Sequence, residues 1–292
     1  MTLRGPAFRI LLAGLLPVLA GCSTSRMTVD FMVPVLENTT EVALRTPDAQ
    51  LVGEALPTSI LLLEGMLETH PKQRDVARMA AMYRFAYAFG FVEDENPERA
   101  LGVYDAGREL AWRSFGREDL ERAIREGTFD EMHAALAEVK EKDTRALLWV
   151  AANWGMWIQL NLGDTRAVAD VARLMPLADR VAELDETLFW GMPRVLLGAL
   201  HAARPVVLGG SPDRSKAEFE EAFRISDRNL LIAQVFFAKS YCVQTFDEDA
   251  FRSSLREVLD APAGRLPEAA LLNQIARAKA RLLLDRAEEI FE

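Results

Sequence analysis

The chain has 292 residues, half of them hydrophobic, and carries 44 acidic against 34 basic side chains for a formal net charge of −10. This length corresponds to one large domain or two ordinary ones. The acidic excess argues against nucleic acid as a partner, because phosphates require a basic face, and it disfavours direct binding to an anionic lipid surface.

Residues 1–21 have the features of a secretory signal peptide. Arg4 and Arg9 make the start basic, and residues 10–19 form a short apolar run. A basic start, a short apolar stretch and small residues before a cleavage point are typical of such a peptide. The run is shorter than the ~20 residues that a membrane-spanning helix requires.

The cysteine that follows changes the interpretation of this signal. Residues 19–22 read Leu-Ala-Gly-Cys, which resembles the bacterial lipobox, where the cysteine is lipidated and becomes the mature N-terminus. We therefore predict that Cys22 is lipidated and that acyl chains anchor the protein to a membrane. The alternative is a plain signal peptide that happens to contain a cysteine. Ser23, in place of an aspartate, favours the outer membrane. The other cysteine, Cys242, stands among apolar residues and is predicted to be a buried, inert thiol.

Residues 22–57 are predicted to be the lipidated N-terminus and a tether, part of which packs as a first helix. Val42, Leu44 and Leu51 are candidates for its apolar face. From Thr58 to residue 292 apolar residues recur at helical spacing, which predicts a helical-repeat domain without strands. The expected helices are 58–69, 72–92, 97–114, 117–126, 128–141, 144–161, 165–184, 187–203, 212–226, 229–245, 247–260 and 267–291.

Proline positions support some of these limits. Pro97 and Pro212 stand in the first turn of their predicted helices, where a missing N–H is tolerated. Pro193 stands inside the predicted helix 187–203, where it should kink the helix.

The predicted helices come in pairs that repeat. Trp149 and Trp190 are 41 positions apart, and the spacing of small and large residues in one second helix recurs in the next. This pattern resembles the tetratricopeptide repeat, whose period is ~34. We predict an all-α fold, an α-solenoid of divergent tetratricopeptide-like hairpins. The alternative is an irregular helical bundle. The residues that recur are Leu174, Ala178 and Val181, followed by Ser215, Phe219 and Ala222.

No catalytic or metal-binding constellation is found. His70, His133 and His201 are far apart in the sequence, and no Cys or carboxylate stands at metal-ligand spacing from them. The acidic run 247–249 is explained better by helix capping than by a catalytic dyad, and the run 93–95 is interpreted in the same way. Neither Gly-x-Ser-x-Gly nor His-Glu-x-x-His occurs. We predict a protein that is not an enzyme and binds no cofactor or metal.

Aromatic residues offer the best candidates for ligand binding. Several share the predicted helix 144–161 and the start of a later first-of-pair helix, the position that often lines the concave face of a solenoid. They either line an apolar groove for a ligand or pack in the core. The candidate groove residues are Trp149, Asn153, Trp154, Trp157 and Trp190.

The order of several motifs resembles the T-component lipoproteins of tripartite ATP-independent periplasmic (TRAP) transporters. These motifs are residues 148–157 (LWVAANWGMW), residues 183–186 (ELDE) and residues 208–213 (LGGSPD). The last is the most specific, and its turn residues are Gly209, Gly210 and Pro212. The resemblance implies a periplasmic, membrane-tethered homotrimer of cryptic tetratricopeptide hairpins. It also implies a pore or cleft through each protomer, a periplasmic solute-binding protein as partner, and delivery of hydrophobic or acidic small molecules to a permease.

Three hypotheses follow for the function. The first is a transport accessory that docks a solute-binding protein and conducts a ligand. The second is a repeat scaffold for envelope assembly without a small-molecule ligand. The third, an envelope enzyme, is the poorest, because no set of residues can be assigned catalytic roles.

Overall fold

The computed structural model describes residues 29, 31–203 and 210–292, and the regular elements in these ranges are all helices. The predicted all-α fold is therefore confirmed. The signal peptide 1–21, Cys22 and Gly209 lie outside the described residues. Within the described ranges, none of the helices combines the length and the apolar character that crossing a bilayer would require.

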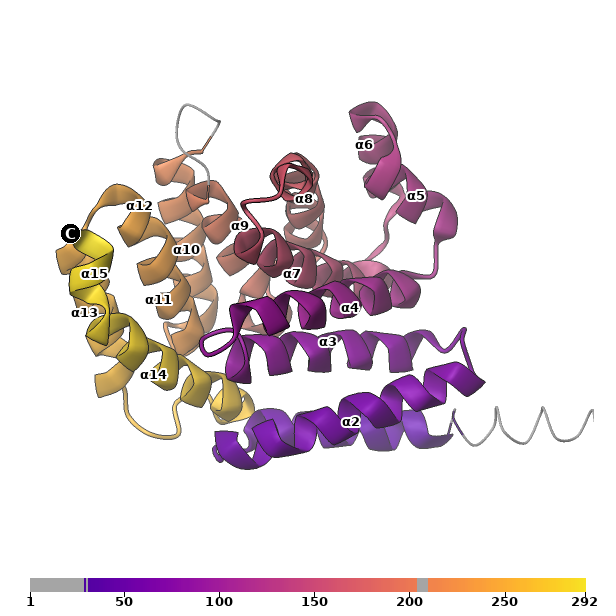
Figure 1. The fold of residues 1–292 in the computed structure, drawn as a ribbon, viewed down its shortest axis with the longest axis horizontal. Coiled ribbons are helices and arrows are strands. Elements are labelled where there is room, and N and C mark those ends of the chain that lie inside the picture. The colour runs from indigo at the N-terminus through magenta and orange to yellow at the C-terminus, as the bar shows by residue number, and fades with distance from the viewer. Residues whose placement is uncertain (1–28, 30, 204–209) are drawn as a thin grey trace, which may run out of the picture.

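A helix over residues 31–45 precedes the labelled elements (Figure 1). The α-helices that follow are α2 (Ala49–Thr69), α3 (Arg74–Phe91), α4 (Pro97–Phe115), α5 (Glu118–Glu126), α6 (Phe129–Glu138), α7 (Thr144–Leu160), α8 (Thr165–Leu184), α9 (Met192–Ala202), α10 (Pro212–Ser226), α11 (Leu231–Phe237), α12 (Val243–Thr245), α13 (Glu248–Asp260), α14 (Ala270–Asp285) and α15 (Ala287–Phe291). Short 3₁₀ turns occupy Glu141–Asp143, Leu188–Trp190 and Pro267–Ala269, and Ala238–Cys242 forms a π-helical turn.

The N-terminal helix boundary differs from the prediction. The helix expected to start at Thr58 starts at Ala49, where the Asp48 carboxylate accepts the N–H of Leu51 at 3.0 Å. Pro57 lies inside α2. A proline there removes one helical hydrogen bond, but buried apolar residues continue at helical spacing on both sides of it. They are Val52, Leu56, Ile60, Leu63 and Leu67. Burial of this stripe outweighs the local defect, so residues 49–57 belong to the packed fold.

The predicted kink at Pro193 is also wrong. The helix expected over 187–203 is two elements, because Phe189, Trp190 and Gly191 all have positive φ angles of 47°, 59° and 96°. The chain then starts α9 at Met192, so Pro193 falls in the first turn. Its missing N–H needs no partner at that position.

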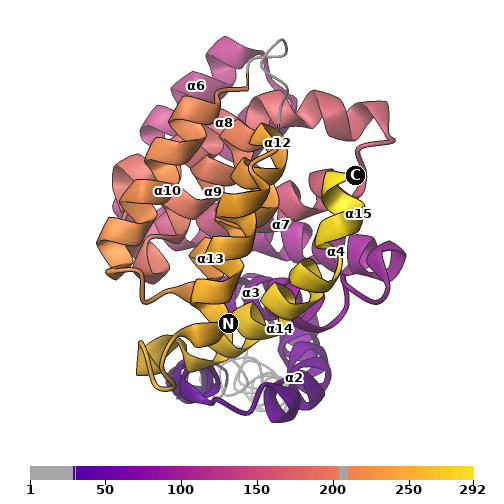
Figure 2. The ribbon, with the colours of Figure 1, turned by 90° about the vertical axis from the view of Figure 1, so that its left-hand side faces the viewer.

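Helices that follow one another along the chain pack against each other. The pairs α3–α4, α7–α8 and α9–α10 are in contact, and so are α4 with α7 and α8 with α9. This stacking is compatible with the predicted solenoid. The chain does not end as an open stack, because α14 packs against α11 and returns to α2 (Figures 1 and 2).

A buried ion pair holds the returning helix. The Nζ atom of Lys279 on α14 lies 2.8 Å from Glu93 and 2.7 Å from Asp94, in the turn after α3. Glu93 also accepts the hydroxyl of Tyr104 at 2.5 Å. The side chains of Lys279 and Glu93 are only 5% and 6% exposed. Glu93 and Asp94 of the acidic run 93–95 thus bind a distant helix, whereas the sequence predicts helix capping for this run.

Candidate functional site

Three adjoining cavities lie between the helices. The central cavity has a volume of about 90 Å³ and is lined by α3, α7, α11, α14 and the N-terminal helices. A charged cavity of about 460 Å³ shares Met82 and Phe189 with it. A large cavity of about 630 Å³ shares Phe85, Leu148 and Phe236 with it. The shared walls place the central cavity between the other two.

The walls of the central cavity are almost wholly apolar. Its polar side chains are Thr40 and Tyr83, whose hydroxyl oxygens lie 2.8 Å apart, and so each satisfies the other. Burial raises the pKa of Tyr83, and the hydrogen bond to Thr40 opposes that rise. The site therefore offers an apolar surface without a fixed charge in its narrowest part.

Aromatic rings follow one another through all three cavities. Consecutive ring centroids are 6.3, 5.3, 5.6, 5.7 and 5.4 Å apart, within the usual range for interacting aromatic pairs. We call this series the aromatic chain; in order it comprises Trp190, Phe189, Trp149, Phe85, Phe89 and Phe236.

The turn before α9 places two of these rings. Phe189 and Trp190 both adopt left-handed backbone angles, which cost about 1–3 kcal/mol each for residues other than glycine. The turn brings Phe189 against Trp149 of α7, with the ring planes at 66°. Trp190 projects on into the charged cavity.

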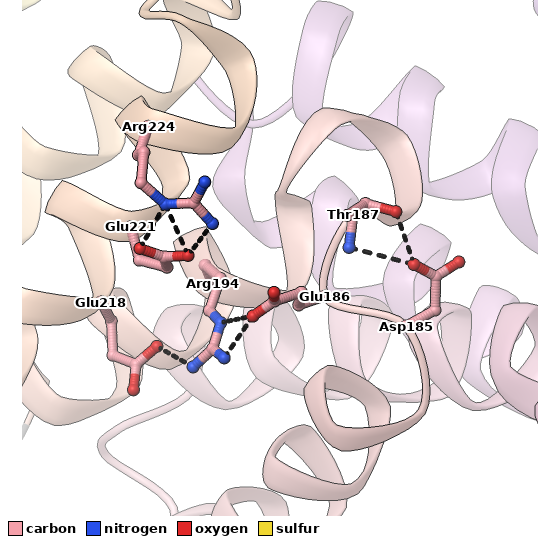
Figure 3. Close-up of polar contacts among 7 residues, drawn as sticks. All are labelled: Asp185, Glu186, Thr187, Arg194, Glu218, Glu221 and Arg224. Atoms are coloured by element: carbon pink, nitrogen blue, oxygen red, sulfur yellow. Dashed lines mark hydrogen bonds and ion pairs between the residues drawn. The ribbon is translucent and has the colours of Figure 1, made fainter.

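A polar network holds this turn on both sides (Figure 3). Asp185 accepts the backbone N–H of Thr187 at 3.0 Å and its hydroxyl at 2.8 Å. Arg194 on α9 donates to Glu186 at 2.5 Å and to Glu218 on α10 at 2.9 Å. The bonds of Arg194 tie Glu186, just before the turn, to α9 and through it to α10, which offsets the backbone strain.

Comparison with known families agrees with this architecture. Residues 45–291 match the family model described as TRAP transporter T-component. The chain belongs to the T-component family. A comparison with curated proteins gave no match. As a T-component, the protein has an accessory role in transport.

The five predicted groove residues of this T-component separate into two groups. Trp149 lines the central cavity and Trp190 the charged cavity. Asn153, Trp154 and Trp157 line none of the three cavities.

These three side chains lie in the contacts between α7 and its neighbours. Asn153 is fully buried and donates to the carbonyl oxygens of Trp149 at 2.8 Å and Ala81 at 3.4 Å. The Trp154 indole donates to Asp170 of α8 at 2.9 Å. Arg108 of α4 lies 4.9 Å from the Trp157 ring.

The family-motif turn leads into α10. Gly210 is buried and Pro212 stands in the first turn of α10, as predicted. Ser211 caps this helix by accepting the N–H of Arg214 at 3.4 Å. These residues position the start of α10 and do not line the three cavities.

Phe85, Phe89, Phe236 and Lys239 were not predicted from the sequence. One signal for Lys239 was visible, because it is the single charged residue in the apolar stretch 230–246. The phenylalanines carry no such signal. An apolar residue on a buried helix face gives the same sequence pattern whether it packs in the core or lines a cavity.

Two further features of the T-component concern metal ligands and the thiol. In the described ranges, no three His, Cys, Asp or Glu side chains form a group that could hold a metal ion. Cys242 is fully buried, and burial raises the pKa of its thiol to about 12. A protonated, inaccessible thiol is a poor nucleophile.

Proposed function

We propose that this T-component docks a periplasmic solute-binding protein and gives a ligand with an apolar body a route through its three cavities. The observation that carries the proposal is the aromatic chain, which links the charged cavity to the large cavity through the central one. Burying apolar ligand surface contributes about 25 cal/mol per Å², and the walls supply that surface.

The central cavity would act as the selective constriction. A volume of about 90 Å³ corresponds to only a few water molecules at ~30 Å³ each. A strongly hydrated ion would lose its water there without polar replacement, which is costly. An apolar chain has no comparable hydration to lose, so the constriction favours an apolar chain over a hydrated ion.

The proposal places the protein in the periplasm, anchored through lipidated Cys22, with the outer membrane favoured by Ser23. A Cys22→Ser variant should lose the anchor and leave the membrane fraction. If that variant stays in the membrane fraction to the wild-type extent, the anchor proposal fails.

The homotrimer is part of the same proposal. Exposed large apolar residues on the N-terminal helices support a contact between subunits. Leu61 and Leu62 on α2 are 70% and 55% exposed. Leu61→Glu should shift the mature protein to monomers in sedimentation velocity, whereas Val168→Glu, at an exposed site on α8, should not. Equal sedimentation of both variants and wild type would exclude this surface as the contact.

Blocking the constriction tests the route. Ala152 on α7 lines both the central and the large cavity, so Ala152→Phe should fill the passage. We expect ligand uptake by cells to fall at least tenfold while the folded protein still binds its genomically neighbouring solute-binding protein. Ala137→Phe, on the exposed face of α6, is the matched control.

The outcome separates the transport hypothesis from the scaffold hypothesis. A scaffold without a ligand predicts that Ala152→Phe leaves uptake unchanged. The docking half of the proposal is tested by sedimentation of the mature protein with the solute-binding protein, and absence of a complex at high micromolar concentration contradicts it.

A further inference from the structure

Lys239 occupies an unusual position in the fold. It lies in the π-helical turn Ala238–Cys242, between α11 and α12, on the wall of the large cavity. Such turns are rare in proteins, and those that do occur are often found at functional sites. The turn is marked by the N–H of Val243, which donates to the carbonyl oxygen of Ala238.

The ammonium group of Lys239 rests on the aromatic chain. It lies 4.9 Å from the ring centroid of Phe236 and 5.8 Å from that of Phe89. Both rings also line the central cavity. Lys239 therefore stands where the large cavity meets the constriction.

No acidic side chain pairs with this ammonium group among the described residues. The charges of Glu93 and Asp94 act on it, but Lys279 bonds to both of these carboxylates, at 2.8 and 2.7 Å. Burial lowers the pKa of Lys239; Lys279 adds to that effect, while Glu93 and Asp94 oppose it. Because the pKa is lowered overall, the two carboxylates compensate the buried charge incompletely. A further anion would be stabilised there.

We infer that Lys239 binds the anionic head group of a ligand whose apolar body lies along the aromatic chain. This inference rests on the proposed ligand route and names the ligand class for it: a monocarboxylate with an extended apolar tail. Lys239 carries one charge and forms no direct ion pair among the described residues, so a ligand with a single negative charge matches it.

The surroundings of Lys239 fit both parts of such a ligand. Ser240 and Gln159 line the same cavity and supply a hydroxyl and an amide group for a carboxylate. Most of the remaining wall is apolar and comes from α7, α8 and α9; it includes Leu174, Val195, Leu196, Ala199 and Leu200.

Calorimetric titration of the mature protein tests this assignment. The ligands are octanoate, decanoate and dodecanoate, and each is compared with the alcohol of equal chain length. Each added methylene should tighten binding about fourfold if it is buried. Wild-type protein should bind each carboxylate about tenfold to hundredfold more tightly than its alcohol, as expected for a charge-assisted hydrogen bond.

Variants locate the effect. Lys239→Met should remove the preference for the carboxylate and leave alcohol binding unchanged, and Lys239→Arg should keep the preference. Lys216→Met removes a lysine that is 54% exposed on α10 and should change neither affinity. The wild-type comparison of acid with alcohol needs no variant, so it remains decisive if Lys239→Met does not fold.

Results that contradict the role of Lys239 can be distinguished from results that contradict the ligand route. Equal affinity for acid and alcohol in wild type, or an unchanged preference in folded Lys239→Met, overturns the role of Lys239 and leaves the apolar route standing. Absence of binding by acids and alcohols alike overturns both the inference and the proposed ligand route.

Discussion

Replacing Lys279 by methionine should destabilise the protein strongly. The substitution keeps the length of the side chain but leaves Glu93, only 6% exposed, without its cation. Removing one partner of a buried ion pair costs about 3–5 kcal/mol. Asp94 is 41% exposed and adds no more than ~1 kcal/mol, since solvent screens it. We expect the free energy of unfolding to fall by about 3–5 kcal/mol in urea denaturation followed by circular dichroism.

A double-mutant cycle isolates the interaction. Lys279→Met with Glu93→Gln leaves no unpaired buried charge, so the double variant should recover most of the loss. Lys216→Met is the control, because its pair with Glu220 spans 3.9 Å at an exposed surface and should contribute less than ~0.5 kcal/mol. A loss below ~1 kcal/mol in Lys279→Met, or a double variant less stable than the single one, would refute the reasoning.

Four other outcomes are expected. Gly107→Ala places a Cβ atom 2.2 Å from Asn153 Oδ1 and should cost about 1–3 kcal/mol in denaturation; Asn153→Ala should reduce that cost, and purely additive effects would contradict the clash. Cys242, whose pKa is raised from 9.0 to about 12, should resist thiol reagents at pH 8 in the folded protein. Because the folded state holds this proton more tightly, its contribution to stability is complete below pH 9 and declines as the pH rises toward 12, which pH-dependent denaturation measures. Arg194→Met should speed amide hydrogen exchange in residues 185–191 specifically, because it frees the turn; uniform exchange across the chain would argue against that role.

Helix limits were predictable where capping residues mark them. The limits predicted for α8 and α10 match the structure, because the side chains of Asp164 and Ser211 cap their starts. The helix predicted to start at Thr58 starts earlier, because a buried apolar stripe continues through Pro57 and outweighs the hydrogen bond that this proline removes.

The site was predictable only in part. Trp149 and Trp190 could be singled out as aromatic residues at repeated positions, but their separation from Asn153, Trp154 and Trp157 depends on which side of α7 faces the cavities. That choice is made by long-range packing with α3, α11 and α14. The left-handed angles at Phe189 and Trp190 have only Gly191 as a local signal.

The contact of α14 with α2 has a consequence for how this molecule can change during evolution. In an open repeat array, each unit touches only its neighbours, so units can be gained or lost and unfolding can spread from either end. Here α14, close to the C-terminus, rests on α2, and a hairpin added or removed between them would separate Lys279 from Glu93. We therefore expect the number of hairpins to be invariant among relatives, with insertions confined to the connecting loops. We also expect this helical stack, closed by the contact of α14 with α2, to unfold in one cooperative transition.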